Sequence, residues 1–315
     1  MKVFRLSSII ITIFAALACN GPKYENFTGY AQGGTYSVSV NLQDVEVDKS
    51  VIAAKIDSLL TEIDFSISGY NKNSVLSRYN AGEKVTPDKH FARLLELSAQ
   101  YKALSNGAFD VTAGPLFDIW GFGFKNDSIP GPKEVEEALE LCKEEKVLNF
   151  NAIAQGYSCD VIAEYLYSIG VKDMLVNIGE IYCDGLNPSG KGWGIGVDNP
   201  VDGNNQPGAD LRGIWKSDGG AHGVVTSGNY RKYYIVDGKK YAHTIDPRTG
   251  YPVEHNLLSA TILAPSAAFA DALATACMVL GMEESKSLIE SIEGVEAYLI
   301  SSDGIWTSDG FHLAQ

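Results

Sequence analysis

The chain has 315 residues and a formal net charge of −14 at pH 7, with 25 Lys and Arg against 39 Asp and Glu. This excess of carboxylates argues against a nucleic-acid-binding protein, because binding to phosphates depends on Lys and Arg. It also disfavours a phosphate-bearing ligand, and a bound cation would ease this repulsion. Strand and helix patterns alternate from residue 29 to residue 315 without a break in composition. We therefore expect one domain of the α+β class.

The N-terminal residues predict an export signal. Two basic residues precede an apolar run over residues 9–18, which is too short to span a membrane, and Cys19 follows. The small residues before Cys19 resemble a bacterial lipobox, although Leu17 stands two residues before the cysteine and not three. We predict a signal peptide over 1–18, a lipid-anchored tether over 19–28 with a diacylated Cys19, and a domain over 29–315 facing the periplasm. Simple cleavage after Ala18 is the alternative.

Hydrophobic periodicity and turn residues give the elements in chain order. Helices are predicted over 51–67, 91–104, 133–142, 157–169 and 267–280. Strands are predicted over 32–40, 174–183, 193–197, 257–263, 296–301 and 304–308, and residues 70–80 read as a polar loop. Tyr70 begins that loop, and on its own it fits a half-buried packing residue better than a ligand platform.

A hairpin is predicted around Asp237-Gly238, since both central residues of a type I′ turn require positive φ. The returning strand leads through His243 to the turn residues Asp246-Pro247-Arg248-Thr249-Gly250. Because Pro fixes φ and Gly permits the reversal, the strand ends there. His243 is therefore expected near the edge of a sheet, where an imidazole can reach a substrate.

The helix predicted over 267–280 is almost wholly apolar, so we expect it to be buried. Its only polar side chains, Asp271 and Thr275, stand four residues apart and share one face. A buried carboxylate is costly unless a cation or a hydrogen-bond donor meets it, and two oxygens on one face suit magnesium. The alternative is an Asp hydrogen-bonded to its own Thr inside an ordinary core helix.

Residues 148–156 run into the helix predicted at 157–169, and a helix start of this kind favours anion binding. The segment has neither GxxxxGK[ST] nor GxGxxG, so a P-loop or a dinucleotide-binding fold is not indicated.

Eight segments, taken together and in this order, resemble the FAD:protein FMN transferase family, the ApbE flavin transferases. They are QGGTYSV (32–38), YNKNSVLSRYN (70–80), GAFDVTAGPL (107–116), LNFNAIAQGYSCD (148–160), WGIGVDNP (193–200), TSGNYRKY (226–233), HTIDPRTG (243–250) and ADALATACMVLG (270–281).

The resemblance implies an α+β fold with a T-fold-like β-sheet core, FAD as substrate and Mg²⁺ as metal. It implies that FMN is joined by a phosphoester bond to a Thr or Ser of an exported acceptor protein, with release of AMP. By the same resemblance His243 is the catalytic residue, and the metal ligands are Asp271, Thr275 and the carbonyl of Ala152. The FAD-binding residues that it implies are Gln32, Tyr70, Ala108, Phe109, Asp110, Asn149, Gln155 and Ile245.

Three of these positions depart from the family pattern. Gln32 stands where Met is frequent, Asn149 where Asp is frequent, and Gln155 where Lys or Glu is common. The metal-binding set is intact, so the chemistry is expected to survive these changes better than the contacts to adenosine. Two alternatives remain: a magnesium-dependent FAD pyrophosphatase that releases FMN and AMP, and a non-catalytic flavin-binding lipoprotein.

Overall fold

The structure is a computed structural model that describes residues 21–122, 129–201, 203–204, 206–230, 233–236 and 239–314. The predicted signal peptide and Cys19 lie outside these residues. Within the described ranges no helix has the length and apolar character needed to cross a membrane.

The α-helices are α1 (Lys49–Ile67), α2 (Val75–Asn80), α3 (Lys89–Leu104), α4 (Gly114–Ile119), α5 (Pro132–Lys143), α6 (Ala154–Ser168) and α7 (Ala267–Glu290), with a 3₁₀ turn η1 (Val111–Ala113). The strands are β1 (Tyr24–Ala31), β2 (Gly34–Asn41), β3 (Met174–Asn177), β4 (Ile181–Asp184), β5 (Gly194–Asp198), β6 (Leu211–Lys216), β7 (His222–Gly228), β8 (Tyr233–Val236), β9 (Lys239–Ala242), β10 (Leu257–Ala264), β11 (Glu296–Ser301), β12 (Gly304–Thr307) and β13 (Leu313–Ala314).

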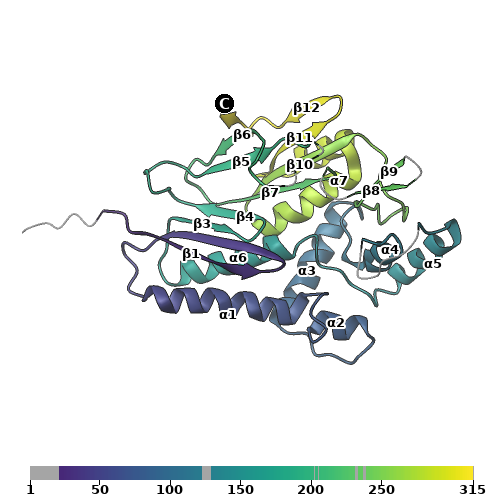
Figure 1. Ribbon diagram of the computed structural model, residues 1–315, viewed down its shortest axis with the longest axis horizontal. Helices are drawn as coiled ribbons and strands as arrows, with labels where there is room; N and C mark the ends of the chain where they lie inside the picture. The colour runs from purple at the N-terminus through teal and green to yellow at the C-terminus, as the bar shows by residue number, and fades with distance from the viewer. Residues whose placement is uncertain are drawn as a thin grey trace, which may run out of the picture.

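An eight-stranded antiparallel sheet forms the centre of the molecule, in the order β1-β2-β3-β4-β7-β10-β11-β12 (Figure 1). Helices α1, α6 and α7 pack on one face of this sheet, and a three-stranded sheet, β13-β6-β5, packs on the other. Strand alternation explains the two interfaces: Val225 faces α7, whereas its neighbour Val224 packs with Trp215 of the small sheet. The predicted class, one α+β domain with a sheet core and packed helices, is confirmed.

The N-terminal boundary of the fold differs from the prediction. Residues 24–31 form edge strand β1, paired with β2, so the sheet begins inside the region predicted to be tether. The strand predicted over 32–40 begins at Gly34, because Gln32 and Gly33 form the turn between β1 and β2 with φ of 51° and 82°. The sequence of β1 mixes polar residues and Gly29 on an exposed edge, which leaves no apolar run to recognise.

The predicted helices at 51–67, 91–104, 133–142 and 157–169 and the strands near 193–197, 257–263, 296–301 and 304–308 are confirmed within about three residues at each end. The single strand predicted over 174–183 is wrong. It is two strands, because the chain reverses at Gly179 with a φ of 96°. The polar loop predicted over 70–80 is wrong from Val75 onward, where Ser74 caps the short helix α2. Strand β6 has no counterpart among the predicted elements.

Helix α7 bends where the prediction ended it. Gly281 has a φ of 76° and a ψ of −176°, but helical structure resumes and continues to Glu290. The bend is fixed from outside the helix: the His255 ring lies against Gly281, and its Nε2 lies 3.0 Å from the Met278 carbonyl oxygen. Gly281 therefore marks a bend and not an end, which local sequence does not distinguish.

Candidate active site

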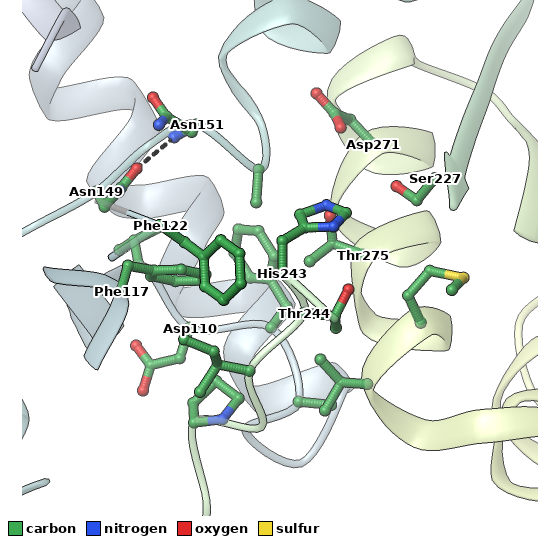
Figure 2. A pocket seen from close by; sticks show the side chains of 18 of the residues that line it. Asp110, Phe117, Phe122, Asn149, Asn151, Ser227, His243, Thr244, Asp271 and Thr275 are labelled. Atoms are coloured by element: carbon green, nitrogen blue, oxygen red, sulfur yellow. Dashed lines mark hydrogen bonds between the residues drawn. The ribbon is translucent and has the colours of Figure 1, made fainter. Parts of the chain in front are cut away.

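A cavity of about 390 Å³ lies beside the carboxyl end of β7, between α7 and the segment that follows β9. Figure 2 shows the His243 ring pointing into this cavity toward the helix that carries Asp271 and Thr275, with Phe117 and Phe122 across from that helix. Its lining residues come from eight separate parts of the chain: Tyr70, Ala108, Phe109, Asp110, Val111, Phe117, Phe122, Asn149, Asn151, Ala152, Gln155, Glu180, Thr226, Ser227, Gly228, Tyr230, His243, Thr244, Ile245, Pro247, Asp271, Thr275, Met278 and Val279.

One wall of the cavity is built by α6 and α7, which lie unusually close together. A methyl group on Gly156 would come within 2.3 Å of the Ala267 carbonyl oxygen and 2.8 Å of Asp271 Cβ, so no larger residue fits there. Asp160 on α6 accepts the backbone N–H groups of Ala267 (2.7 Å) and Ala268 (2.9 Å) at the start of α7. This carboxylate satisfies two helix N–H groups that have no partner inside the helix, and it fixes the two helices to each other.

The buried carboxylate of Asp271 fits the metal-binding role predicted for it. Its one described hydrogen bond comes from the Gly156 N–H at 3.0 Å, and no Lys or Arg in the described part of the chain pairs with it. Burial raises the pKa of the Asp271 carboxyl above its usual range, and the nearby Asp160 raises it further, whereas the Gly156 bond lowers it. A carboxylate desolvated in this way favours a cation beside it.

The other predicted metal ligands also line the cavity. Thr275 stands one turn after Asp271, and Ala152 lies in the loop before α6. Among the described residues there is no group of three or more His, Cys, Asp or Glu suited to a metal. A hydroxyl, a carbonyl and a single carboxylate suit Mg²⁺, which keeps several waters and takes substrate phosphates as ligands. The residues present therefore fit Mg²⁺ but not a His- or Cys-bound metal.

The second wall is the segment from His243 to Pro247. The His243 ring lies edge-on to Phe122, with ring centroids 6.3 Å apart, so an aromatic group flanks this histidine. Behind the wall, the Trp120 indole N–H donates to the Gly250 carbonyl oxygen at 2.8 Å. Arg248 pairs with Asp246 at 2.9 Å.

Two of the predicted flavin-binding side chains also hold the local backbone. The Asn149 side-chain oxygen accepts the Asn151 N–H at 2.9 Å, which shapes the loop leading to Ala152 (Figure 2). The Asp110 carboxylate accepts the Thr112 N–H at 2.9 Å and pairs with Lys102 at 2.8 Å. Both residues therefore keep the cavity in shape in addition to any contact with a ligand.

Of the remaining predicted residues, all but one reach the cavity. Ala108, Phe109, Gln155 and Ile245 line it, and Tyr70 lines it while staying 74% exposed, so its aromatic ring is accessible to a ligand in the cavity. Gln32 is the exception. It lies in the β1–β2 turn, its Nε2 donates to Ser158 Oγ, and it is not among the lining residues. The roles assigned to all these residues remain predictions.

Several lining residues were not predicted. Thr244 and Pro247 lie in the family segment 243–250, and Ser227 and Tyr230 lie in the family segment 226–233. Their place in these two segments was the available signal. Met278 and Val279 lie one turn beyond Thr275 on α7. Phe117, Phe122 and Glu180 reach the cavity only through the tertiary fold.

The sequence and the fold of this chain match known proteins over nearly their full length. The model of the ApbE family matches residues 33–299. A relative from Vibrio cholerae named FAD:protein FMN transferase is 31% identical over 96% of this chain and 94% of its own length. The chain belongs to the ApbE family. A relative of the same name from Escherichia coli K12 is 32% identical over 82% of this ApbE-family chain and 80% of its own.

Solved structures of ApbE proteins have the same fold. The Vibrio cholerae flavin transferase ApbE superposes with a TM-score of 0.79 at 30% identity, over 91% of this chain and 98% of its own. The apo form of the Pseudomonas stutzeri flavinyl transferase ApbE also superposes with a TM-score of 0.79. It is 32% identical, over 91% of this chain and 94% of its own. The cavity described above is therefore the candidate active site of an ApbE-family protein.

Proposed function

We propose that this protein is an FAD:protein FMN transferase that cleaves FAD and attaches FMN to an acceptor protein. The observation that carries the proposal is one cavity that holds His243 opposite Asp271 and Thr275 within an ApbE-family fold. Relatives that cover most of this chain at 31% and 32% identity bear that name. The reaction class follows from the site and the family together.

The finer chemistry is part of the proposal. A Thr or Ser hydroxyl of the acceptor attacks the FMN-side phosphorus of the FAD pyrophosphate. The new P–O bond is a phosphoester, the P–O bond to AMP breaks, and the hydroxyl proton passes to the His243 imidazole, since imidazole accepts protons near neutral pH. Tyr70 and Phe109 offer aromatic faces to the flat rings of FAD. These residues position the substrates, which is most of what phosphoryl transfer asks of a protein.

Mg²⁺ completes the proposed site. Asp271, Thr275 and the Ala152 carbonyl would hold it, and when bound it supplies charge neutralisation at the pyrophosphate as a Lewis acid. The net charge of −14 supports this assignment, because an acidic protein needs a cation to receive an anionic substrate.

Export and anchoring through Cys19 are proposed on the sequence alone. The sheet starts at Tyr24, so four residues would separate a lipidated Cys19 from β1 and hold the domain close to the membrane. Cys19→Ala should move the protein from the membrane fraction to the soluble exported fraction. Unchanged fractionation would refute the anchor.

The test of the transferase is incubation with FAD, Mg²⁺ and an acceptor domain, followed by mass spectrometry of the acceptor. The expected result is an added FMN on one hydroxyl residue and one AMP per FMN transferred. The matched controls are the acceptor with that hydroxyl residue changed to Ala and the enzyme without acceptor. Free FMN and AMP with no acceptor adduct would identify a pyrophosphatase instead, and bound but intact FAD would identify a binding protein.

A further inference from the structure

His243 follows a hairpin that is not part of the main sheet. Among the described residues, strands β8 and β9 pair with each other in a two-stranded sheet of their own, and His243 comes directly after β9. The ladder of the eight-stranded sheet therefore does not extend to this residue. The next residue, Thr244, is hydrogen-bonded to Asn229 at the end of β7, and the bridge between Ile245 and Pro252 closes the turn that follows it.

Thr244 is held on both its backbone and its side chain. Its carbonyl oxygen accepts the Val253 N–H at 3.1 Å, and its hydroxyl donates to Asn229 Oδ1 at 2.6 Å. Both members of the side-chain bond are buried, with exposures of 9% for Thr244 and 8% for Asn229. A buried hydrogen bond of this kind is hard to replace, since removing one partner leaves the other unsatisfied.

Asn229 is itself fixed to the main sheet. It follows the last residue of β7, and its N–H donates to the Leu258 carbonyl oxygen of β10 at 3.0 Å. Asn229 is not among the residues that line the cavity, although Gly228 and Tyr230 on either side of it are. The Asn229 side chain is therefore engaged with the residue after His243 and does not line the cavity.

We infer that the Asn229–Thr244 hydrogen bond positions the imidazole of His243, and that both are positioning residues for the transfer step. The inference rests on the proposed function, in which His243 is the base. A base must lie within hydrogen-bond reach of the hydroxyl that it deprotonates. Small displacements of catalytic groups cost rate steeply, about 10²-fold for 1 Å. The bond joins the residue next to the base to the end of β7 in the eight-stranded sheet.

The first test uses pairs of variants that differ in one hydrogen-bonding group. Thr244→Val keeps the side-chain shape and removes the hydroxyl, whereas Thr244→Ser keeps the hydroxyl. Asn229→Leu removes the acceptor oxygen, whereas Asn229→Asp keeps it. We expect kcat to fall about 10- to 100-fold in Thr244→Val and Asn229→Leu, with the dissociation constant of FAD within about twofold of wild type. The Ser and Asp variants should recover most of the loss.

The second test separates positioning from general destabilisation. In the His243→Ala background, Thr244→Val should slow single-turnover transfer no further, because there is no imidazole left to position. If Thr244→Val slows the His243→Ala enzyme by the same factor as wild type, or raises the FAD dissociation constant instead of lowering kcat, the inference is wrong. Thermal midpoints decide whether Thr244→Val is folded. If it is not, the Asn229→Leu and Asn229→Asp pair carries the test.

Failure of this inference can be told apart from failure of the proposed function. If His243→Ala alone transfers FMN at the wild-type rate, the base is misassigned whatever the Thr244 variants do. If His243→Ala is slow and both Thr244→Val and Asn229→Leu retain wild-type kcat, the base stands and the positioning bond does not.

Discussion

The two walls of the cavity are built in different ways. On the α6–α7 wall, two helices pack against each other, Asp160 of α6 accepts two N–H groups at the start of α7, and Gly156 permits their close approach. The His243 wall is a short segment outside the helices and strands, and its hydrogen bonds to other parts of the protein include those from Thr244 to Asn229 and from Trp120 to Gly250. A change that loosens the first wall therefore affects the folding free energy, whereas a change in the second alters the placement of one side chain. The predictions below test that difference.

The largest effect is expected at Asp271. Asp271→Asn removes the only carboxylate proposed to bind Mg²⁺, and a Lewis acid at a phosphoryl oxygen is worth several kcal/mol, so transfer should fall by at least about 10³-fold. The thermal midpoint should not fall, since burial already disfavours this charge. The measurement is turnover across a magnesium titration, with the exposed Asp44→Asn as control. Near-normal turnover at limiting magnesium would contradict the assignment.

His243→Ala comes next. The variant should still bind FAD and Mg²⁺ but should transfer FMN about 10²- to 10⁴-fold more slowly, the usual contribution of a general base. The wild-type rate should fall at acid pH, where imidazole takes up a proton, and this acid limb should be absent in the variant. Single-turnover transfer across pH with saturating FAD measures both effects. A variant that keeps the rate and the acid limb would make His243 structural.

On the α6–α7 wall, Asp160→Asn should lower the free energy of unfolding by about 1–2 kcal/mol, the cost of losing a helix cap. The amide nitrogen of Asn cannot accept a backbone N–H, so one of the two bonds to the start of α7 is lost. Urea unfolding measures the loss. The matched control is Asp48→Asn at the exposed start of α1, which should cost less. If the two variants lose equal free energy of unfolding, Asp160 contributes no more to stability than an exposed helix cap does.

Tyr70 stands at the exposed rim of the cavity. Tyr70→Ala should raise the FAD dissociation constant about tenfold, within the range of a lost stacking contact, with little change of rate at saturation. Quenching of flavin fluorescence measures the constant, and Tyr70→Phe, which keeps the ring, should bind FAD like wild type. Unchanged affinity in Tyr70→Ala would mean that this ring does not contact the flavin or the adenine.

The smallest effect concerns His90, which lies behind the α6 wall with its Nδ1 2.9 Å from the Tyr157 hydroxyl. Burial lowers the pKa of His90 and the positive Lys89 adds to this, against the opposite effects of Asp88 and Glu62. The folded protein thus takes up this proton less readily than the unfolded chain does. Stability should therefore be lost as pH falls below about 6.5, the ordinary value for an exposed imidazole.

His90→Asn should flatten that acid dependence of the urea midpoint between pH 7.5 and pH 5. His312→Asn, at an exposed histidine, should leave it in place. An acid slope that is the same in wild type and His90→Asn would show that this histidine is not its source.

The sequence by itself predicted much of this protein because the relevant signals are local. Apolar periodicity identified the buried helix of Asp271 and Thr275, and the ordered family motifs gave the fold class and the residues of the cavity. The family assignment and the FMN transferase class agree with the relatives and solved structures. The predicted roles of single residues, the metal and the lipid anchor stay predictions.

Only the tertiary structure decided what depends on distant partners. Edge strand β1 forms because β2 pairs with it, and Gly281 bends α7 because His255 packs there. Asn229 lies fifteen positions before Thr244, yet their bond joins the His243 segment to the end of β7. Gln32 stays outside the cavity because the β1–β2 turn directs it to Ser158. Periodicity reports which face of an element is buried, but not which neighbour covers that face, and the neighbour decides where a catalytic side chain points.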